Sequence, residues 1–153
     1  FLLHLYMEVK VILKSLNFGK DSLNLRITKL KMIDTQYTKD LLDSIVDGIT
    51  NVKGEEITIL DLREIENAFC QYFVICTGNS STQVSSLAGS IERTVKTEMS
   101  ERPFHVEGTQ NNQWILLDYT NVIVHVFQKE YREYYDIESL WGDAIETRIE
   151  MEY

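Results

Sequence analysis

Apolar residues fall at helical spacing in two stretches of the chain. The first follows Thr38 and ends near Asn51 and Gly54, and its other side is polar. The second follows Ser80, which forms a capping box with Gln83. We therefore predict two amphipathic helices. Their apolar stripes are Leu41, Leu42, Ile45, Val46 and Ile49 in the first, and Val84, Leu87, Ala88, Ile91 and Val95 in the second.

Other apolar runs are short and rich in β-branched or aromatic residues, which is typical of strands. The run 72–76 is apolar at consecutive positions, as in a strand covered on both faces. The runs 114–119 and 122–127 are separated only by Thr120-Asn121, which predicts a tight hairpin. From Lys129 the chain is aromatic and acidic, with helical turns expected. Further strands are predicted at 57–62 and 104–106.

The predicted order is helix, strand, strand, helix, three strands and a final helical segment. A single mixed sheet of about five strands with flanking helices is the simplest layering, so we expect an α+β or α/β fold. The length of 153 residues fits one domain, and 44% hydrophobic with 25% charged residues is ordinary for a globular chain.

Charge divides the chain near Met32. Residues 1–31 carry six bases and two acids, a net of +4, which leaves a net of −13 on 32–153. We interpret 1–31 as a basic leader outside the domain, either translated upstream sequence or an expression remnant, with Met32 as the natural start. The alternative is a real basic arm or an organelle-type leader. On the first interpretation the leader is dispensable and 32–153 form one domain.

The overall charge of −9 disfavours a nucleic-acid ligand and favours a basic protein partner. No apolar run reaches the roughly 20 residues that span a bilayer. Cys70 and Cys76 are too few for a disulfide framework and lack ligand-spaced companions, so we expect reduced thiols and no metal site. On one strand their even spacing would place both on the same face. We expect a cytoplasmic protein without a cofactor.

Candidate catalytic patterns are incomplete. The turn Gly78-Asn79-Ser80 could cradle a phosphate at a helix start, but it lacks the Lys of a P-loop and the glycines of a dinucleotide fingerprint, so a plain helix cap is the favoured interpretation. A nucleotidyltransferase would need two metal-binding carboxylates on the next strand, where this chain has His105 and Glu107. His125 lies among apolar strand residues, which is more typical of a packed side chain than of a catalyst.

Two segments could instead form a contact surface. Asp118 and Tyr119 end a strand, as turn residues or as an exposed acidic and aromatic patch. The segment after Lys129 combines acids with Tyr, Arg and Trp, the types favoured at interface hot spots, although it could also be an aromatic cap over the sheet.

Three stretches taken together resemble the ribosomal silencing factor family, also called RsfS or Iojap-like. The first is Tyr-Phe-Val-Ile-Cys-Thr-Gly-Asn-Ser at 72–80 followed by Gln83-Val84, and the second is Trp-Ile-Leu-Leu-Asp-Tyr at 114–119. The third is Val-His-Val-Phe at 124–127, running into Arg-Glu-Tyr-Tyr-Asp-Ile-Glu-Ser-Leu-Trp-Gly-Asp-Ala at 132–144. The resemblance covers roughly 38–144.

The resemblance implies a nucleotidyltransferase-like fold without the catalytic carboxylates, and no enzymatic activity. It implies binding to the large ribosomal subunit through large-subunit ribosomal protein fourteen, which blocks association with the small subunit and lowers translation under nutrient limitation. It also implies homodimers when free. Gln71 departs from the family, which usually has Asp there, and Cys70 replaces a small polar residue.

We therefore expect a partner-binding surface at the hairpin end and in the segment after it. The alternatives left open are a degenerate nucleotidyltransferase-like enzyme using Gly78–Ser80 and an adaptor for another basic protein. Trp114 and Trp141 are the members most expected in the core, and Asp118 is expected to be exposed. The predicted contact residues are Trp114, Asp118, Tyr119, His125, Tyr134, Tyr135, Trp141 and Asp143.

Overall fold

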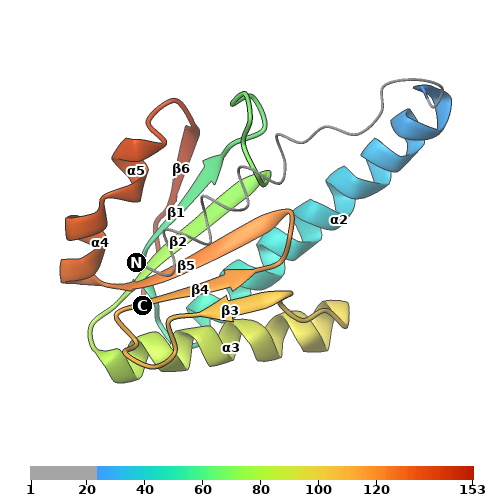
Figure 1. Cartoon of the computed structure of the whole chain (residues 1–153). Helices are drawn as coiled ribbons and strands as arrows, with labels where there is room; N and C mark the ends of the chain where they lie inside the picture. Colours follow the sequence, from blue (N-terminus) through green and yellow to red (C-terminus); the bar gives the residue numbers. More distant parts are fainter. Residues whose placement is uncertain (1–23) are drawn as a thin grey trace.

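The computed structural model describes residues 24–153, with side chains described from Asp34 onward (Figure 1). Most elements form where the apolar pattern predicts them. The helices are α2 (Asn24–Thr50), α3 (Ser81–Met99), α4 (Lys129–Tyr135) and α5 (Ile137–Leu140). The strands are β1 (Glu55–Asp61), β2 (Tyr72–Gly78), β3 (His105–Glu107), β4 (Trp114–Asp118), β5 (Val122–Gln128) and β6 (Ile145–Ile149).

The strands form one mixed sheet in the order β3-β4-β5-β2-β1-β6. β2 and β5 pair in parallel, whereas the other described pairs are antiparallel. The predicted α+β class with a single mixed sheet is confirmed, and β4–β5 is the predicted hairpin. The sheet has six strands, one more than expected, because β6 pairs with β1 at an edge that the apolar pattern did not reveal.

Helices α2 and α3 cover one face of the sheet, as Figure 1 shows. Their stripes pack Leu41, Ile45, Leu87 and Ile91 at 0% exposure against aliphatic strand residues. The two helices meet closely at Gly48, where an added Cβ would lie 2.7 Å from the Cα of Ile91. This face is a closed aliphatic core, whose burial supplies the main driving force for folding.

The opposite face of the sheet carries a more aromatic core. Phe73, Phe127 and Leu116 project from the central strands, and Phe69 and Ile137 pack on them from the 62–71 loop and from α5. Tyr131 and Trp141 lie at the margin of this cluster, partly buried. The two faces are therefore built from different side chains, and the second positions the segment after Lys129.

Two sequence expectations need comment. Cys70 and Cys76 are both buried and form no disulfide, but β2 begins only at Tyr72, so they belong to cores on opposite faces. The expected shared face is therefore wrong. Helix α2 begins at Asn24, so the boundary expected at Met32 falls inside this helix. Residues 1–23 of the expected leader lie outside the described residues.

Candidate functional site

The start of β4 and the end of α4 bring three predicted contact residues together. Trp114 stacks on Phe127, with ring centroids 4.8 Å apart, and its other neighbour is Tyr135 at the same distance. Tyr134 meets Tyr135 edge to face at 5.1 Å and is 80% exposed. We call Trp114, Tyr134 and Tyr135 the aromatic ridge, because they lead from a partly buried strand residue to a solvent-exposed ring.

His125 lies directly beneath the ridge and is completely buried. Its Nδ1 accepts a hydrogen bond of 3.1 Å from Trp114 Nε1, and its ring meets Phe73 at 4.6 Å. Burial lowers the pKa of His125 to about 3, so the imidazole is neutral at physiological pH. With Nδ1 accepting, the proton resides on Nε2, which has no hydrogen-bond partner. The predicted contact role of His125 is thus replaced by support of the Trp114 ring.

Trp141 and Asp143 lie beyond the ridge, after α5. Trp141 caps the aromatic core, with ring centroids 5.5 Å from Phe73 and 5.6 Å from Phe69, and it remains partly exposed. Asp143 is exposed. Tryptophan at such a margin buries a large ring while leaving an edge accessible to solvent.

Asp118 and Tyr119 lie at the other end of the hairpin and do not join the ridge. Asp118 is 0% exposed, and its Oδ1 accepts a 2.7 Å hydrogen bond from the Thr120 N–H. Tyr119 is 7% exposed and belongs to the core under α2 and α3, where burial raises its pKa. The expected exposure of Asp118 is wrong, because its carboxylate is used inside the turn.

Arg132 anchors α4 to the sheet. Its side chain is only 11% exposed and donates from Nε and Nη2 to Glu138 Oε1, at 2.8 and 2.6 Å. Nη1 reaches the Glu56 carbonyl at 2.6 Å and Thr77 Oγ1 at 2.9 Å, and Nη2 reaches Thr58 Oγ1 at 3.1 Å. One guanidinium therefore ties α4 and α5 to β1 and β2.

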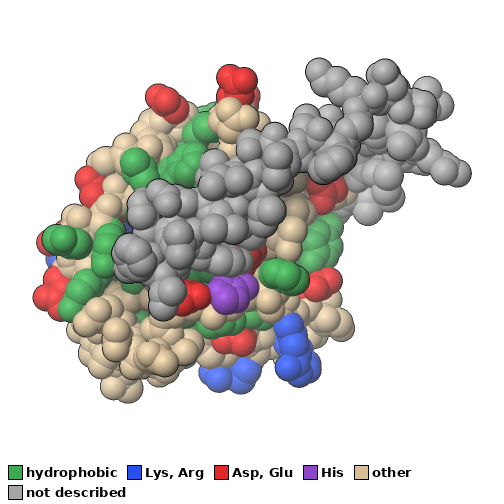
Figure 2. Space-filling view, viewed as in Figure 1, with side chains coloured by type: hydrophobic (Ala, Val, Ile, Leu, Met, Phe, Trp, Pro, Cys, Tyr) green, Lys and Arg blue, Asp and Glu red, His purple; other side chains and the backbone are tan. Residues whose placement is uncertain are grey.

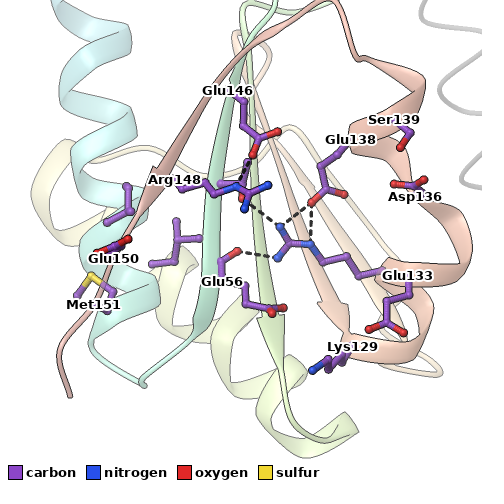
Figure 3. Close-up of a pocket in the computed structure, with 14 residues that line it drawn as sticks. Glu56, Lys129, Glu133, Asp136, Glu138, Ser139, Glu146, Arg148, Glu150 and Met151 are labelled. Atoms are coloured by element: carbon purple, nitrogen blue, oxygen red, sulfur yellow. Dashed lines mark hydrogen bonds and ion pairs between the residues drawn. The ribbon is translucent and has the colours of Figure 1, made fainter.

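A groove of about 870 Å³ lies between this anchor and β6. Figure 3 shows Glu146 and Arg148 projecting from β6 over it, opposite Glu138. Its charged lining comprises six acids and three bases, and two of the bases, Arg132 and Arg148, are already paired with Glu138 and Glu146. The acids are Glu56, Glu133, Asp136, Glu138, Glu146 and Glu150.

Acidic and apolar side chains mix over this side of the molecule. Where Figure 1 places α4 and α5, the left margin of Figure 2 shows green hydrophobic and red acidic groups side by side. The exposed large hydrophobics of these helices are Tyr134, Tyr135 and Leu140. Such a mixture suits a basic protein partner with an apolar contact of its own.

The turn at Gly78–Ser80 is occupied by capping interactions. Ser80 Oγ accepts a 3.1 Å hydrogen bond from the Gln83 N–H, and Gln83 Oε1 accepts one of 2.6 Å from the Asn79 N–H. On the following strand, His105 and Glu107 contact each other at 2.7 Å. The Asn79 and Gln83 N–H groups, the Ser80 hydroxyl and the His105 and Glu107 side chains are therefore engaged with other groups of the protein.

From Asp34 onward, where side chains are described, His, Cys, Asp and Glu do not gather in threes in a way that could hold a metal ion. None of the described helices is both long and apolar enough to cross a membrane.

Sequence reasoning missed Arg132 as an anchor and missed the strand at 145–149. The sequence pattern grouped Arg132 with the hot-spot residue types, although its guanidinium is paired with Glu138 inside the molecule. A signal for the anchor was present: Thr58 lies between two isoleucines and Thr77 ends an apolar run, and the hydroxyl oxygen of each accepts a hydrogen bond from Arg132. Gln71, which departs from the family pattern, donates to Asp34 of α2 at 2.9 Å.

Comparison with known proteins gives consistent matches. The model of the family described as ribosomal silencing factor during starvation matches residues 35–153. The ribosomal silencing factor RsfS of Halalkalibacterium halodurans is 35% identical over 112 residues, covering 73% of this chain and 94% of the relative. RsfS of Bacillus subtilis is 38% identical over 109 residues, covering 69% and 88%.

Solved structures agree. A crystal structure of a Chromobacterium violaceum protein superimposes with a TM-score of 0.64 at 32% identity, covering 68% of this chain and 85% of that one. A Bacillus halodurans structure gives 0.61 at 31% identity, covering 74% and 99%. A more distant relative is the chloroplastic protein Iojap of Zea mays, 26% identical over 113 residues, which cover 72% of this chain and 46% of that protein.

Proposed function

Because this chain belongs to the ribosomal silencing factor family, we propose that it binds the large ribosomal subunit through large-subunit ribosomal protein fourteen. Bound there, it blocks association with the small subunit and lowers translation when nutrients are limiting. We also propose that it acts in the cytoplasm without a cofactor and self-associates when free.

The observation that carries the docking site is the aromatic ridge. Tyr134 and Tyr135 are 80% and 46% exposed, which is unusual for rings held by a packed neighbour. Tyr135 is held against Trp114, and Arg132 holds the helix that presents it. A pre-organised ring loses little conformational freedom on binding, so its burial contributes fully to affinity.

Acidic side chains around the ridge support a basic partner. Glu130, Glu133 and Asp136 lie within or beside α4, and Asp143 follows α5. Ribosomal proteins must be rich in Lys and Arg to contact RNA, so opposite charge would raise the association rate and orient the encounter. The −9 charge of the whole chain disfavours direct contact with ribosomal RNA.

Catalysis is not part of the proposal. Ser80 and Gln83 form hydrogen bonds that cap the start of α3, and His105 contacts Glu107. An assay with a nucleoside triphosphate and magnesium tests this point. Turnover that disappears in Ser80→Ala would establish the alternative of a residual nucleotidyltransferase-like enzyme.

Co-sedimentation with isolated large subunits tests binding, and light scattering during subunit mixing tests the block. Tyr134→Ala and Tyr135→Ala should weaken binding by about tenfold or more if these rings are hot spots. Phe104→Ala is the matched control, because Phe104 is 82% exposed just before β3, across the hairpin from the ridge. It should bind like the parent protein.

The outcomes separate the possibilities. Binding of the parent that is lost in both tyrosine variants, but kept in Phe104→Ala, supports the ridge as the docking site. Equal binding of all folded variants would place the contact elsewhere on the chain. No binding of the parent to large subunits would overturn the ribosomal function and favour an adaptor for another basic protein.

A further inference from the structure

Strand β6 forms an open edge of the sheet. It pairs with β1 on one side, and no strand within residues 24–153 pairs with its other side. Ile145 is 57% exposed, and Glu146, Thr147 and Arg148 are also exposed. Figure 1 shows β6 at the margin of the sheet, beside α5. An exposed edge offers a row of backbone donors and acceptors to another strand.

The sequence of β6 is complementary to itself when read antiparallel. With Thr147 opposite Thr147 of a second copy, each Glu146 faces an Arg148 and each Ile145 faces an Ile149. We propose that β6 is a self-association edge, at which two copies join their sheets through antiparallel β6 strands related by a twofold axis. This specifies the surface for the self-association included in the proposed function.

Charge complementarity identifies the occupant as a second copy. Glu146 and Arg148 already attract each other within one chain, at 2.5 Å, so both stand on the same face of β6. Across the joined edge each would gain an opposite charge directly across, about 4.5–5.5 Å away between Cβ atoms. Shifting the register by one residue would turn the two chains' charged faces away from each other.

The apolar residues reinforce the same register. Ile145 and Ile149 project from the other face of β6, where Ile149 packs at the margin of the α2–α3 core. Pairing would cover the exposed Ile145 with the Ile149 of the second copy. A slip by two residues loses both isoleucine pairs and both charge pairs, and it places like charges opposite each other, so the centred arrangement is favoured on both faces.

The edge is small, which sets the expected strength. Five residues per strand bury less area than the roughly 1,000 Å² of a stable interface, and two chains of charge −9 repel each other at long range. The dimer should therefore be weak and exchange rapidly, with a dissociation constant in the micromolar range or above. At about 0.15 M salt the long-range repulsion is screened, whereas the paired charges at contact retain part of their attraction.

Charge reversal tests the register directly. Glu146→Arg places two arginines opposite each other in a homodimer, and Arg148→Glu places two glutamates opposite each other. An equimolar mixture of the two variants restores an opposite-charge pair at both positions. Glu98→Arg on α3 changes the net charge like Glu146→Arg but lies far from β6 along the chain and on another element. Sedimentation velocity over about 5–500 µM full-length chain measures each sample.

The expected result is association of the parent and of Glu98→Arg, weakening by about tenfold in each β6 variant, and recovery in the mixture. Circular dichroism checks that each variant is folded. Recovery of association in the mixture would also show that both variants are folded, because unfolded chains could not pair. Equal association of all variants would overturn the proposal and leave self-association to another surface. A parent that stays monomeric at 500 µM would overturn it as well.

Large-subunit binding separates this inference from the proposed function. Co-sedimentation of the two β6 variants measures docking independently of self-association. If the parent binds large subunits but its association does not follow the charge pattern, the β6 edge fails and the ribosomal function stands. If association follows the charge pattern but the parent does not bind large subunits, the β6 edge stands and the ribosomal function fails.

Discussion

The two ends of the β4–β5 hairpin differ in how their polar and aromatic side chains are used. At the turn end, Asp118 and Tyr119 are buried. At the open end, Trp114 packs against Tyr135, and Tyr135 packs against Tyr134. Both tyrosines are exposed. Both ends place a tyrosine next to an acid in the sequence: Asp118 precedes Tyr119 at the turn end, and Tyr135 precedes Asp136 near the open end. What separates them is the next element: a two-residue turn at one end and α4 at the other.

The difference teaches that local composition does not determine exposure. The turn end is closed by its own backbone and by α2, because Asn121 Nδ2 donates to Asp34 Oδ1 at 2.8 Å and to Thr38 Oγ1 at 3.3 Å. At the open end, Arg132 fixes α4 against β1 and β2, and α4 presents Tyr134 and Tyr135 to solvent. One end therefore serves stability, and the other is free to serve recognition.

Asp118→Lys should give the largest effect on stability. A lysine at a completely buried carboxylate position loses the bond to the Thr120 N–H and places an unpaired charge in the core. We expect the free energy of unfolding to fall by about 3–5 kcal/mol. Urea denaturation measures this, with Asp118→Asn as the control that keeps an acceptor oxygen. A melting temperature within a few degrees of the parent would show that this end is open after all.

Arg132→Met should loosen the open end. The substitution keeps much of the side-chain volume but removes all five donated hydrogen bonds and leaves Glu138 without its partner. We expect a loss of about 2 kcal/mol, since hydrogen bonds to charged groups contribute about 1.5–3 kcal/mol. Amide hydrogen exchange should rise first in α4. Arg132→Lys is the control that keeps the positive charge but lacks the planar guanidinium with its several donors. If the amides of α4 in Arg132→Met stay as protected from exchange as in the parent, Arg132 does not anchor this helix.

His125 should make stability fall in mild acid. Its pKa is about 3 when folded and about 6.5 in the unfolded chain. Below pH 6.5 the unfolded state therefore takes up a proton that the folded state excludes, and stability drops as pH falls. Between pH 6.5 and 5 the loss should reach about 1.5 kcal/mol. Urea titrations at each pH measure it. His125→Phe should remove this component, and an unchanged pH profile would mean that the ring is hydrated.

Asn121→Ala should have the smallest effect. It removes two side-chain hydrogen bonds between the turn and α2, and it leaves Gln71 as the remaining donor to Asp34. We expect a loss of about 1 kcal/mol. A double-mutant cycle with Gln71→Ala, followed by urea denaturation, measures whether both donors act through Asp34. Strict additivity would show that they do not.

The sequence predicted the fold well wherever burial is strong. The stripes of α2 and α3 and the strand runs 72–76 and 122–127 became the core because apolar periodicity reports burial directly. β6 was missed because Glu146, Thr147 and Arg148 are solvent-exposed and its isoleucines resemble an ordinary surface segment. Only pairing with β1 makes this segment a strand, and such long-range pairing leaves no local signal.

The site was predicted less completely. Trp114, Tyr134 and Tyr135 do come together, and Trp141 does pack at the margin of the core. Asp118 could not be placed from sequence, because a single acid at a strand end is equally compatible with solvent or with a buried hydrogen bond. The apolar neighbours of His125 favoured a packed side chain, but they did not reveal its hydrogen bond to Trp114. The deciding partners, Thr120 and Trp114, act through geometry that composition does not encode.

The pairing of β1 with β6 also has a consequence for the order of events during synthesis. Ile57 lies opposite Ile149, so β1 waits for the synthesis of β6 before this edge is covered. β2 likewise waits for β5, since Tyr72 lies opposite Val122. Pairings this distant in sequence fold slowly and leave apolar strands exposed meanwhile. The sheet of a nascent chain therefore stays incomplete until β6 has emerged, and chaperone contact should be concentrated in the interval before that.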